Sequence, residues 1–423
     1  MRCQYACGTN EHGVSRRAFL GGAAGAGLAA LTSPLAAKEL SSKQKRVLVV
    51  WLSGGVSQLE TWDPKPGTVT GGPFRAIPTS VPGIYISELL PKTAKWMHKL
   101  ALVRGINTKE DDHGKGAYIM HTGRRQEPAN SFPHLGSVCS KLLTTDANPL
   151  PGYLNIVPGG GGQSAADAAY LGPRFGSVGI GEGKAPANLD RPGSINNDLD
   201  QQRHMLRQAA NERFLARRRS AMTEAYTQTY DQARLLMEKK SLFNIDSEAV
   251  PVGDRYGRHD FGRHCLLARR LLEGGATFVK VTHTNYDTHH ENFDFHIEQL
   301  SEFDKPFSNL LEELDDRGML ESTLIMVKSE FGRTPNINRN YGRDHWSRAW
   351  SVALGGCGLK PGAVVGKTNA TGTAVVDREV DGGHLFHTYL RALGFDSKRN
   401  FYVDQRPMPM ADPKGAAIEE ILA

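Results

Sequence analysis

Acidic and histidine residues gather directly after four apolar segments of this chain. The segments are 46–52, 100–105, 277–282 and 323–329, and the residues after them are Ser57, Glu60 and Asp63, then Glu110-Asp111-Asp112-His113, then His283, Asp287, His289 and His290, then Glu330 with Asp344-His345. Carboxylate oxygens and imidazole nitrogens together suit divalent ions, with zinc or manganese favoured and calcium the less suited ion. The pattern therefore predicts a divalent metal centre if the four segments end at one place.

The four apolar segments have the composition of buried strands. Segment 46–52 is nearly continuous in apolar and β-branched residues, which is typical of a strand covered on both faces in a parallel sheet. Between the strands, the spacing of apolar residues predicts helices over 201–240, 261–273, 292–317 and 385–393. This alternation predicts an α/β fold, a doubly wound and mostly parallel sheet with helices on both faces. Ligands bind such sheets at the carboxyl ends of the strands, so the polar clusters are expected at one edge.

The segment from about Pro158 to Asn197 departs from this alternation. It carries four consecutive glycines, Gly159 to Gly162, and several prolines, which predict a long irregular region of the kind that covers or shapes a site. We expect residues 38–423 to form a single domain with an insertion at about 155–245.

Each polar cluster also has an ordinary structural interpretation. Residues 287–290 suit a solvent-exposed loop, and Glu330 with Arg333 suits a surface ion pair, which contributes little to stability. The pairs 112–113 and 344–345 suit capped turns. The arrival of all four clusters at strand ends favours the metal interpretation over these alternatives.

Five stretches of the chain resemble the domain-of-unknown-function 1501 family, a group within the alkaline phosphatase and sulfatase superfamily. The stretches are 54–66, 113–123, 287–289, 330–335 and 342–346. The resemblance covers nearly all of the chain after its N-terminal segment, and 330–335 is its most specific stretch. It implies the α/β fold of the superfamily and a metal-dependent hydrolase of phosphate or sulfate esters.

The resemblance also implies which residues hold metal. By position, the matching residues are Asp287, His289 and His345 for one metal, Glu330 as the late acid of a second metal, and Glu60 or Asp63 as its early acid. The early acid lies several residues later in this chain than the superfamily usually places it.

The nucleophile position departs from the superfamily pattern. Sulfatases place a Cys or Ser at the start of a helix that ends in Thr-Gly, and counting back from Thr122 that place is filled by His113. Three alternatives follow: a water activated by the metal attacks while His113 is a ligand or general base, His113 attacks directly, or the site is degenerate and only binds. Arg333 is expected to clamp the anionic oxygens of the substrate. Phe331 stands where the superfamily often has a metal-binding histidine.

The first 37 residues predict an export signal. Residues 15–20, with the pair Arg16-Arg17, precede an apolar stretch rich in Ala and Gly, and Leu35-Ala36-Ala37 offers small residues to a signal peptidase. This pattern resembles a twin-arginine signal, which implies export of the folded protein by the twin-arginine machinery to the periplasm or the medium. The alternative is an N-terminal anchor helix, but the apolar run is too short to span a bilayer comfortably, so no membrane span is expected after cleavage.

Charge and cysteine content narrow the choice of function. The formal charge of +6 is mild and dispersed, and gives no indication of nucleic-acid binding. After residue 37 only Cys139, Cys265 and Cys357 remain, spaced too widely for a zinc ribbon or redox pair, and they allow at most one disulfide.

The sequence thus predicts an exported metal-dependent hydrolase of a small-molecule or glycan ester of phosphate or sulfate. The alternative is an exported, non-catalytic binding protein that keeps the same fold.

Overall fold

A computed structural model describes residues 44–145, 148–159, 162–181, 184–186, 188–217, 221–403 and 405–423. The export signal predicted over residues 1–37 lies outside the described residues, so it stays a prediction. Among the residues that are described, no helix is both long enough and apolar enough to cross a bilayer. Cys139, Cys265 and Cys357 are buried and each is a free thiol.

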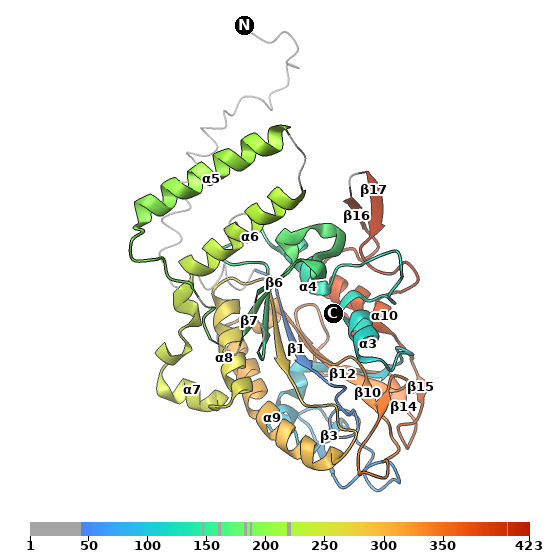
Figure 1. The fold of residues 1–423 in the computed structure, drawn as a ribbon. Helices are drawn as coiled ribbons and strands as arrows, with labels where there is room; N and C mark the ends of the chain where they lie inside the picture. Colours follow the sequence, from blue (N-terminus) through green and yellow to red (C-terminus); the bar gives the residue numbers. More distant parts are fainter. Residues whose placement is uncertain are drawn as a thin grey trace, which may run out of the picture. The chain divides into compact units, whose positions relative to one another are not determined.

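The described part of the chain is built on a sheet of nine strands (Figure 1). In spatial order they are β13 (Val364–Val365), β4 (Leu100–Ile106), β12 (Trp350–Gly356), β9 (Thr323–Lys328), β1 (Arg46–Leu52), β8 (Phe278–His283), β5 (Tyr153–Val157), β7 (Ser177–Gly181) and β6 (Gly162–Ser164). The pairs β1–β8, β1–β9, β5–β8, β5–β7 and β13–β4 are parallel, whereas β12 and β6 run antiparallel to their neighbours. The prediction of a mostly parallel α/β sheet is confirmed.

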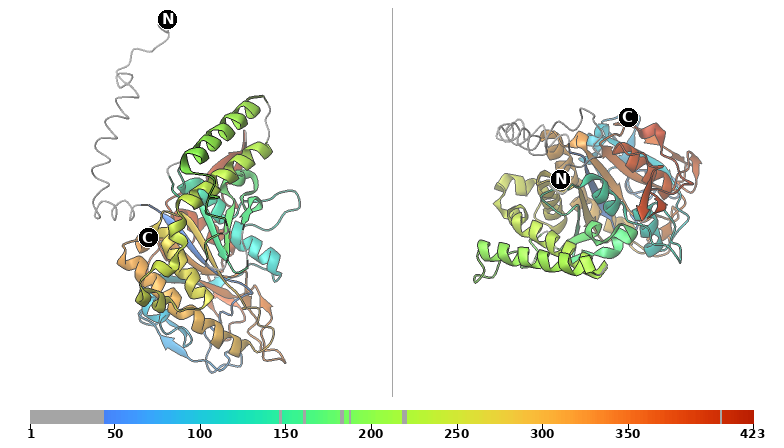
Figure 2. Two further views of the ribbon diagram at one scale, coloured as in Figure 1. Left: turned by 60° about the vertical axis from the view of Figure 1, so that its left-hand side comes forward. Right: turned by 90° about the horizontal axis from the view of Figure 1, so that it is seen from above.

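Alternate residues of the central strand enter two separate apolar cores. Leu48, Val50 and Leu52 pack into the core shared with α7 (Val250–Tyr256), α8 (Asp260–Glu273) and α9 (Asn292–Asp316). The intervening residues of β1 pack into the core shared with α3 (His113–Thr122), α4 (Leu135–Leu143) and α10 (Gly382–Ala392). Figures 1 and 2 show the yellow and orange helices on one side of the sheet and the teal and red ones on the other. Burial on both faces explains why the segment reads as a continuous apolar run.

The predicted helices lie close to their predicted positions, but β5, β12 and β13 are strands that were not predicted, and further differences fall between residues 158 and 240. The long helical pattern over 201–240 is two helices, α5 (Asn197–Arg217) and α6 (Ala221–Glu238). The prediction of an irregular region over 158–197 is wrong for 177–181, which form β7 inside the sheet, and for 162–164, which form its edge strand. These strands are short and rich in Gly and Ser, so their sequence carries little of the apolar signal that marks β1.

Short hairpins and turns complete the fold. They are β2 (Ala76–Pro78) with β3 (Tyr85–Ser87), β10 (Gly332–Arg333) with β11 (His345–Trp346), β14 (Lys367–Thr368) with β15 (Val375–Asp377), and β16 (Asn400–Val403) with β17 (Arg406–Pro409). The β10–β11 pair follows the carboxyl end of β9 along the chain.

Candidate metal centre

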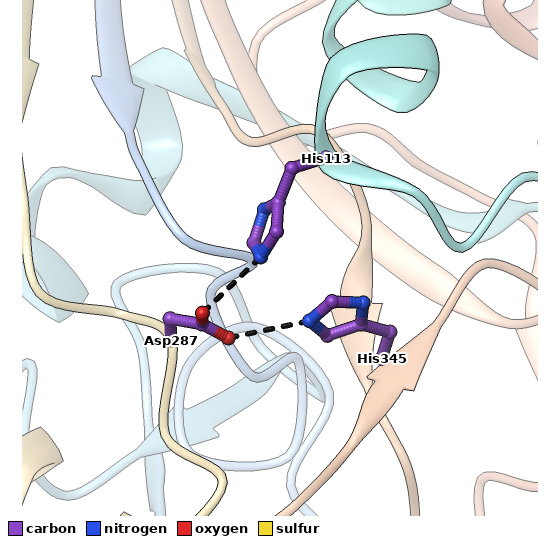
Figure 3. Close-up of side chains that lie close together, drawn as sticks. All are labelled: His113, Asp287 and His345. Carbon is purple, nitrogen blue, oxygen red and sulfur yellow. Dashed lines mark hydrogen bonds and ion pairs between the residues drawn. The ribbon is translucent and has the colours of Figure 1, made fainter.

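One helix start, one loop and one short strand meet beyond the carboxyl ends of the central strands. Figure 3 shows His113 from the start of α3, Asp287 from the loop after β8 and His345 from β11 turned toward one another. One ligand atom from each lies within 4.8 Å of the other two. The Asp287 carboxylate is central: Oδ2 lies 3.2 Å from His113 Nε2, and Oδ1 lies 3.3 Å from His345 Nε2. His289 joins the same group, with Nε2 3.1 Å from Asp287 Oδ1 and 3.0 Å from His345 Nε2.

Local sequence fixes the position of His113. Asp112 caps the helix by accepting a hydrogen bond from Lys115 N at 2.9 Å, so α3 begins at His113. Gly123 ends the helix in the left-handed region, with φ of 68°. The imidazole is therefore held on a rigid element at the positive end of a helix, which favours negative charge in the site.

Gly54 allows the loop after β1 to approach the site closely. Its φ is +115°, and a Cβ added here would lie 2.5 Å from the backbone nitrogen of Asp287. Its own N–H donates to Glu330 Oε1 at 2.8 Å. A side chain at position 54 would separate the two loops that carry Asp287 and Glu330, so the glycine is required by packing as well as by its backbone angle.

In each of the three histidines, an oxygen acceptor holds Nδ1. His113 Nδ1 lies 2.8 Å from Glu330 Oε1, and His289 Nδ1 lies 2.7 Å from Asp344 Oδ1. His345 Nδ1 lies 2.7 Å from the main-chain oxygen of Asp111, which can only accept. The Nδ1 atoms therefore donate, and each neutral ring presents the lone pair of its Nε2 toward Asp287.

This arrangement brings together hydrogen-bond acceptors, which cannot pair with one another. Three Nε2 lone pairs and two carboxylate oxygens are all acceptors, so protons or a cation must lie between them. Acceptor oxygens on the far nitrogen are also the usual way that proteins orient metal-binding histidines. A tetrahedral zinc ion with bonds of about 2.1 Å needs ligand atoms roughly 3.4 Å apart. The separations of 3.0–3.3 Å among Asp287 Oδ1, His289 and His345 are near this value. The donor set fits a divalent ion.

Charge from several sides stabilises the Asp287 carboxylate. Partial burial raises its pKa, but the hydrogen bond and charge of Arg333, with His113 and His289, outweigh burial and hold the pKa at about 2. The hydrogen bond to Glu330 raises the pKa of His113 against desolvation, and Asp287 adds to the increase. Asp287 is thus held in its charged, ligand-competent form.

Glu330 orients His113. It is buried, its Oε1 accepts from Gly54 N and faces His113 Nδ1, and its Oε2 accepts from Ser329 Oγ at 2.9 Å. Oε1 therefore faces two donors, whereas Oε2 shares the single hydroxyl proton of Ser329 with the carbonyl of Leu52. The geometry places this carboxylate behind the histidine, where it fixes the ring orientation.

Phe331 closes the site on the side next to Glu330. The ring is fully buried, with its centroid 4.9 Å from that of His113 and 4.5 Å from that of His345. It fills the place where a further histidine was expected from the superfamily pattern. In this chain an apolar ring that packs against two imidazoles lies there instead.

Two predicted ligands lie elsewhere. Glu60 is fully buried and both of its oxygens bind Arg343, at 2.8 and 3.0 Å. Asp63 accepts from Lys65 Nζ at 2.9 Å and from the hydroxyl of Thr368, and it lies 3.7 Å from Arg104 Nε. The structure brings neither carboxylate to the Asp287 cluster, because each is already neutralised by cations of its own.

Arg333 differs from its predicted role as a substrate clamp. It is fully buried, and its donors are directed at the carbonyls of Gly54, Gly55 and Arg343 and at Asp287. The nearby carboxylate it pairs with is Asp287 rather than Glu330. With these donors used, the side chain positions Asp287 and has none of them directed at a substrate.

Sequence reasoning missed two residues of the site. Asp344 and the carbonyl of Asp111 hold Nδ1 of His289 and His345, although both acids belong to clusters singled out by their position after strands. The position of each acid near a histidine in the chain could have marked it as part of the site. Sequence position could not show which histidine each acid holds, because Asp344 contacts a ring 55 residues away.

Several solved structures are similar to this chain at low identity. A protein of the alkaline phosphatase superfamily from Vibrio parahaemolyticus is 12% identical, with a TM-score of 0.37 over 84% of this chain and 68% of that one. The lipoteichoic acid synthase LtaP from Listeria monocytogenes is 7% identical, with a TM-score of 0.40 over 88% and 76%. The sulfatase PsFucS1 from Pseudoalteromonas sp. is 12% identical, with a TM-score of 0.38 over 93% and 74%.

Comparison with curated proteins gives no match. A family described as proteins of unknown function, DUF1501, matches residues 44–422, which is nearly the whole of the chain. The chain therefore belongs to the DUF1501 family.

Proposed function

We propose that this protein is a metal-dependent hydrolase of a phosphate or sulfate ester. The proposal rests on one observation above others: three imidazoles with their Nδ1 atoms held by oxygen acceptors direct Nε2 at a single carboxylate. The resemblance of the strand-end stretches to alkaline phosphatases and sulfatases supports the choice of ester. The substrate would be a small molecule or a glycan that carries the anionic group.

Asp287, His113 and His345 would hold the metal, with His289 beside Asp287 and His345 as a further ligand. The nitrogen-rich donor set favours zinc or manganese. A divalent ion bound there would supply Lewis-acid stabilisation of the ester oxygens and would lower the pKa of a water molecule. Glu330 and Asp344 would keep the imidazoles in the binding tautomer. The start of α3 would add the partial positive charge of a helix N-terminus beside the substrate anion.

Water is the nucleophile that this geometry favours. The start of α3 offers no hydroxyl or thiol, since His113 occupies that place. Direct attack by His113 is disfavoured because Nδ1 faces Glu330 and Nε2 faces Asp287, so neither nitrogen is free to reach an ester. Among the three alternatives, His113 as a ligand or base beside an attacking water agrees best with these contacts.

The test is hydrolysis of an aryl phosphate and an aryl sulfate with zinc, manganese or calcium added. We expect activity with zinc or manganese that is lost in Asp287→Ala and kept in Ser57→Ala, because Ser57 is buried away from the cluster. Purified protein without stoichiometric metal, and with no metal uptake, would contradict the proposal. Tight metal binding without hydrolysis of any ester would instead favour the binding-protein alternative.

We also propose export by the twin-arginine route to the periplasm or the medium, from the pair Arg16-Arg17 and the apolar stretch after it. Cell fractionation tests this. Replacement of both arginines by lysine should retain the protein in the cytoplasm at its full length. Unchanged export of that variant would rule the route out.

A further inference from the structure

A second polar cluster lies on the sheet face that carries α3 and α4. It contains Lys280 from β8, Lys328 from β9, His121 from the last turn of α3 and His134 from the start of α4. His121 lies eight residues after His113 in α3, a distance of about 12 Å along the helix axis. The cluster is therefore separate from the metal centre.

Lys280 has an unusual position for a lysine. It lies in the interior of β8, half-buried, with Nζ 5.7 Å from the centre of the Trp51 ring. No hydrogen bond or ion pair holds this ammonium within the described part of the chain. Its register neighbour in β5, Asn155, has a buried Oδ1 that also lacks a partner.

Two histidines extend the cluster above Trp51. The His121 ring lies over that indole at 4.4 Å between centroids, and the His134 ring stacks on His121 at 5.0 Å. Both imidazoles are half-buried, so solutes can reach them. His121 makes only these ring contacts among the described residues, and its ring nitrogens are available to a ligand.

Positive charge in this cluster is not balanced. Lys328 is almost fully buried and donates to the carbonyl of Met120 at 2.7 Å, but it pairs with no carboxylate in the described residues. Asp167 is the one acid close by, and it already accepts from Ser164 and Ser177 and lies 3.5 Å from His134 Nδ1. Burial and the nearby charge of Lys280 lower the pKa of Lys328 to about 7, so this second lysine carries only part of its charge near neutral pH. Lys280 is the cation on this sheet face that is costly to bury without a counter-ion.

Burial lowers the pKa of Lys280 to about 8, and the negative charges of Asp167 and Glu330 offset part of this effect. The amine therefore stays largely protonated near neutral pH. A bound anion would supply the missing charge and would accept hydrogen bonds from groups that have no partner in the chain.

We propose that Lys280, His121 and His134 form a binding site for a small oxyanion such as sulfate, phosphate or a carboxylate. Lys280 supplies the charge and the two imidazoles supply N–H donors. The Asn155 amide, which lies opposite Lys280 in the sheet register and can present either its oxygen or its nitrogen, offers a further polar group. Lys328, on β9 and separated from β8 by β1, adds partial positive charge to the same sheet face. This site does not depend on the metal centre or on hydrolysis.

Calorimetric titration with inorganic sulfate, with chloride at equal ionic strength as reference, tests the proposal. Five proteins are compared: the unsubstituted chain, Lys280→Met, Lys280→Arg, His345→Ala and Lys95→Met, the last being an exposed lysine far along the sequence from the cluster. We expect Lys280→Met to weaken sulfate binding at least about 10-fold, since a charged hydrogen bond is lost. Lys280→Arg and Lys95→Met should stay close to the unsubstituted protein, and His345→Ala should keep this binding event.

Thermal unfolding gives a second measurement of binding, which does not depend on a detectable heat of binding. Sulfate should raise the midpoint of the unsubstituted protein more than that of Lys280→Met, because a ligand stabilises only the state that binds it. Equal sulfate affinity and equal midpoint shifts in these two proteins would overturn the proposal. Loss of binding in His345→Ala but not in Lys280→Met would overturn it as well, by assigning the anion to the metal centre. Repetition with phosphate and with acetate identifies which oxyanion fits best.

Discussion

Two carboxylates that follow parallel strands, Glu60 and Asp287, have opposite environments in this protein. Glu60 is fully buried and bound through both oxygens to Arg343, which is equally buried. Asp287 has a side chain that is 48% exposed, and it faces the Nε2 atoms of three histidines. Both were candidate metal ligands by sequence, yet only one is surrounded by groups that a cation would satisfy.

The difference shows what makes a carboxylate available for chemistry. A buried carboxylate with a guanidinium on both oxygens has its charge and lone pairs satisfied, so it stabilises the loops that it joins. Asp287 also contacts a guanidinium, but Arg333 leaves Oδ2 to His113 and shares Oδ1 with two other imidazoles. Unsatisfied acceptors, rather than residue type, separate the metal site from the structural pair.

The largest expected effect is on stability, from Glu60→Ala. This change leaves the Arg343 guanidinium buried without its partner, which should cost about 3–5 kcal/mol of unfolding free energy. Denaturant titration measures it, and metal bound per folded chain should not change. The double variant Glu60→Met with Arg343→Met should recover much of the loss, since it leaves no unpaired charge. A loss of metal from fully folded Glu60→Ala would contradict the purely structural role of Glu60.

Asp287→Ala should act in the opposite way. Metal affinity should fall by more than about 100-fold, beyond the range associated with outer residues of a metal site, because the central ligand is gone. Zinc titration against a chromogenic chelator measures the affinity. The free energy of unfolding of the metal-free protein should change far less than in Glu60→Ala, since Asp287 is partly exposed. Unchanged zinc affinity would contradict the proposal that Asp287 is the central metal ligand.

Glu330→Gln tests whether this acid orients His113 or binds metal itself. As an orienting group it should lower zinc affinity by about 10–100-fold, with the stoichiometry unchanged. The amide keeps an oxygen that can accept from His113 Nδ1, so Glu330→Leu should have the larger effect. An affinity loss as large as that of Asp287→Ala would identify Glu330 as a direct ligand.

Asp344→Asn should give the smallest change. The residue is 54% exposed and holds only His289, so we expect a loss of about 10-fold in zinc affinity. Asp344 and Glu330 act on different histidines, and their effects should add in the double variant. Strong non-additivity would mean that the three imidazoles do not bind as separate ligands.

The sequence alone predicted four strands of the central sheet and the residue types at its edge. The apolar runs at 46–52, 100–105, 277–282 and 323–329 predict β1, β4, β8 and β9 within a residue or two, because strands buried on both faces must be apolar throughout. The same logic located Asp287, His289 and His345 after strands. The strands β5, β12 and β13 were not predicted, nor were β7 and β6. The local signals of β7 and β6 are weak, and their place depends on the pairing of β7 with β5 and of β6 with β7.

Only the tertiary structure decided which polar groups meet. His113 and Glu330 are 217 residues apart and Glu60 and Arg343 are 283 apart, so no local pattern specifies either pair. Close packing at Gly54 sets the approach of the loops, and that approach leaves Asp287 open to three imidazoles while Glu60 is enclosed with its arginine. Sequence supplies the donors and acceptors, but the long-range packing determines which of them remain unsatisfied and are therefore able to bind a ligand.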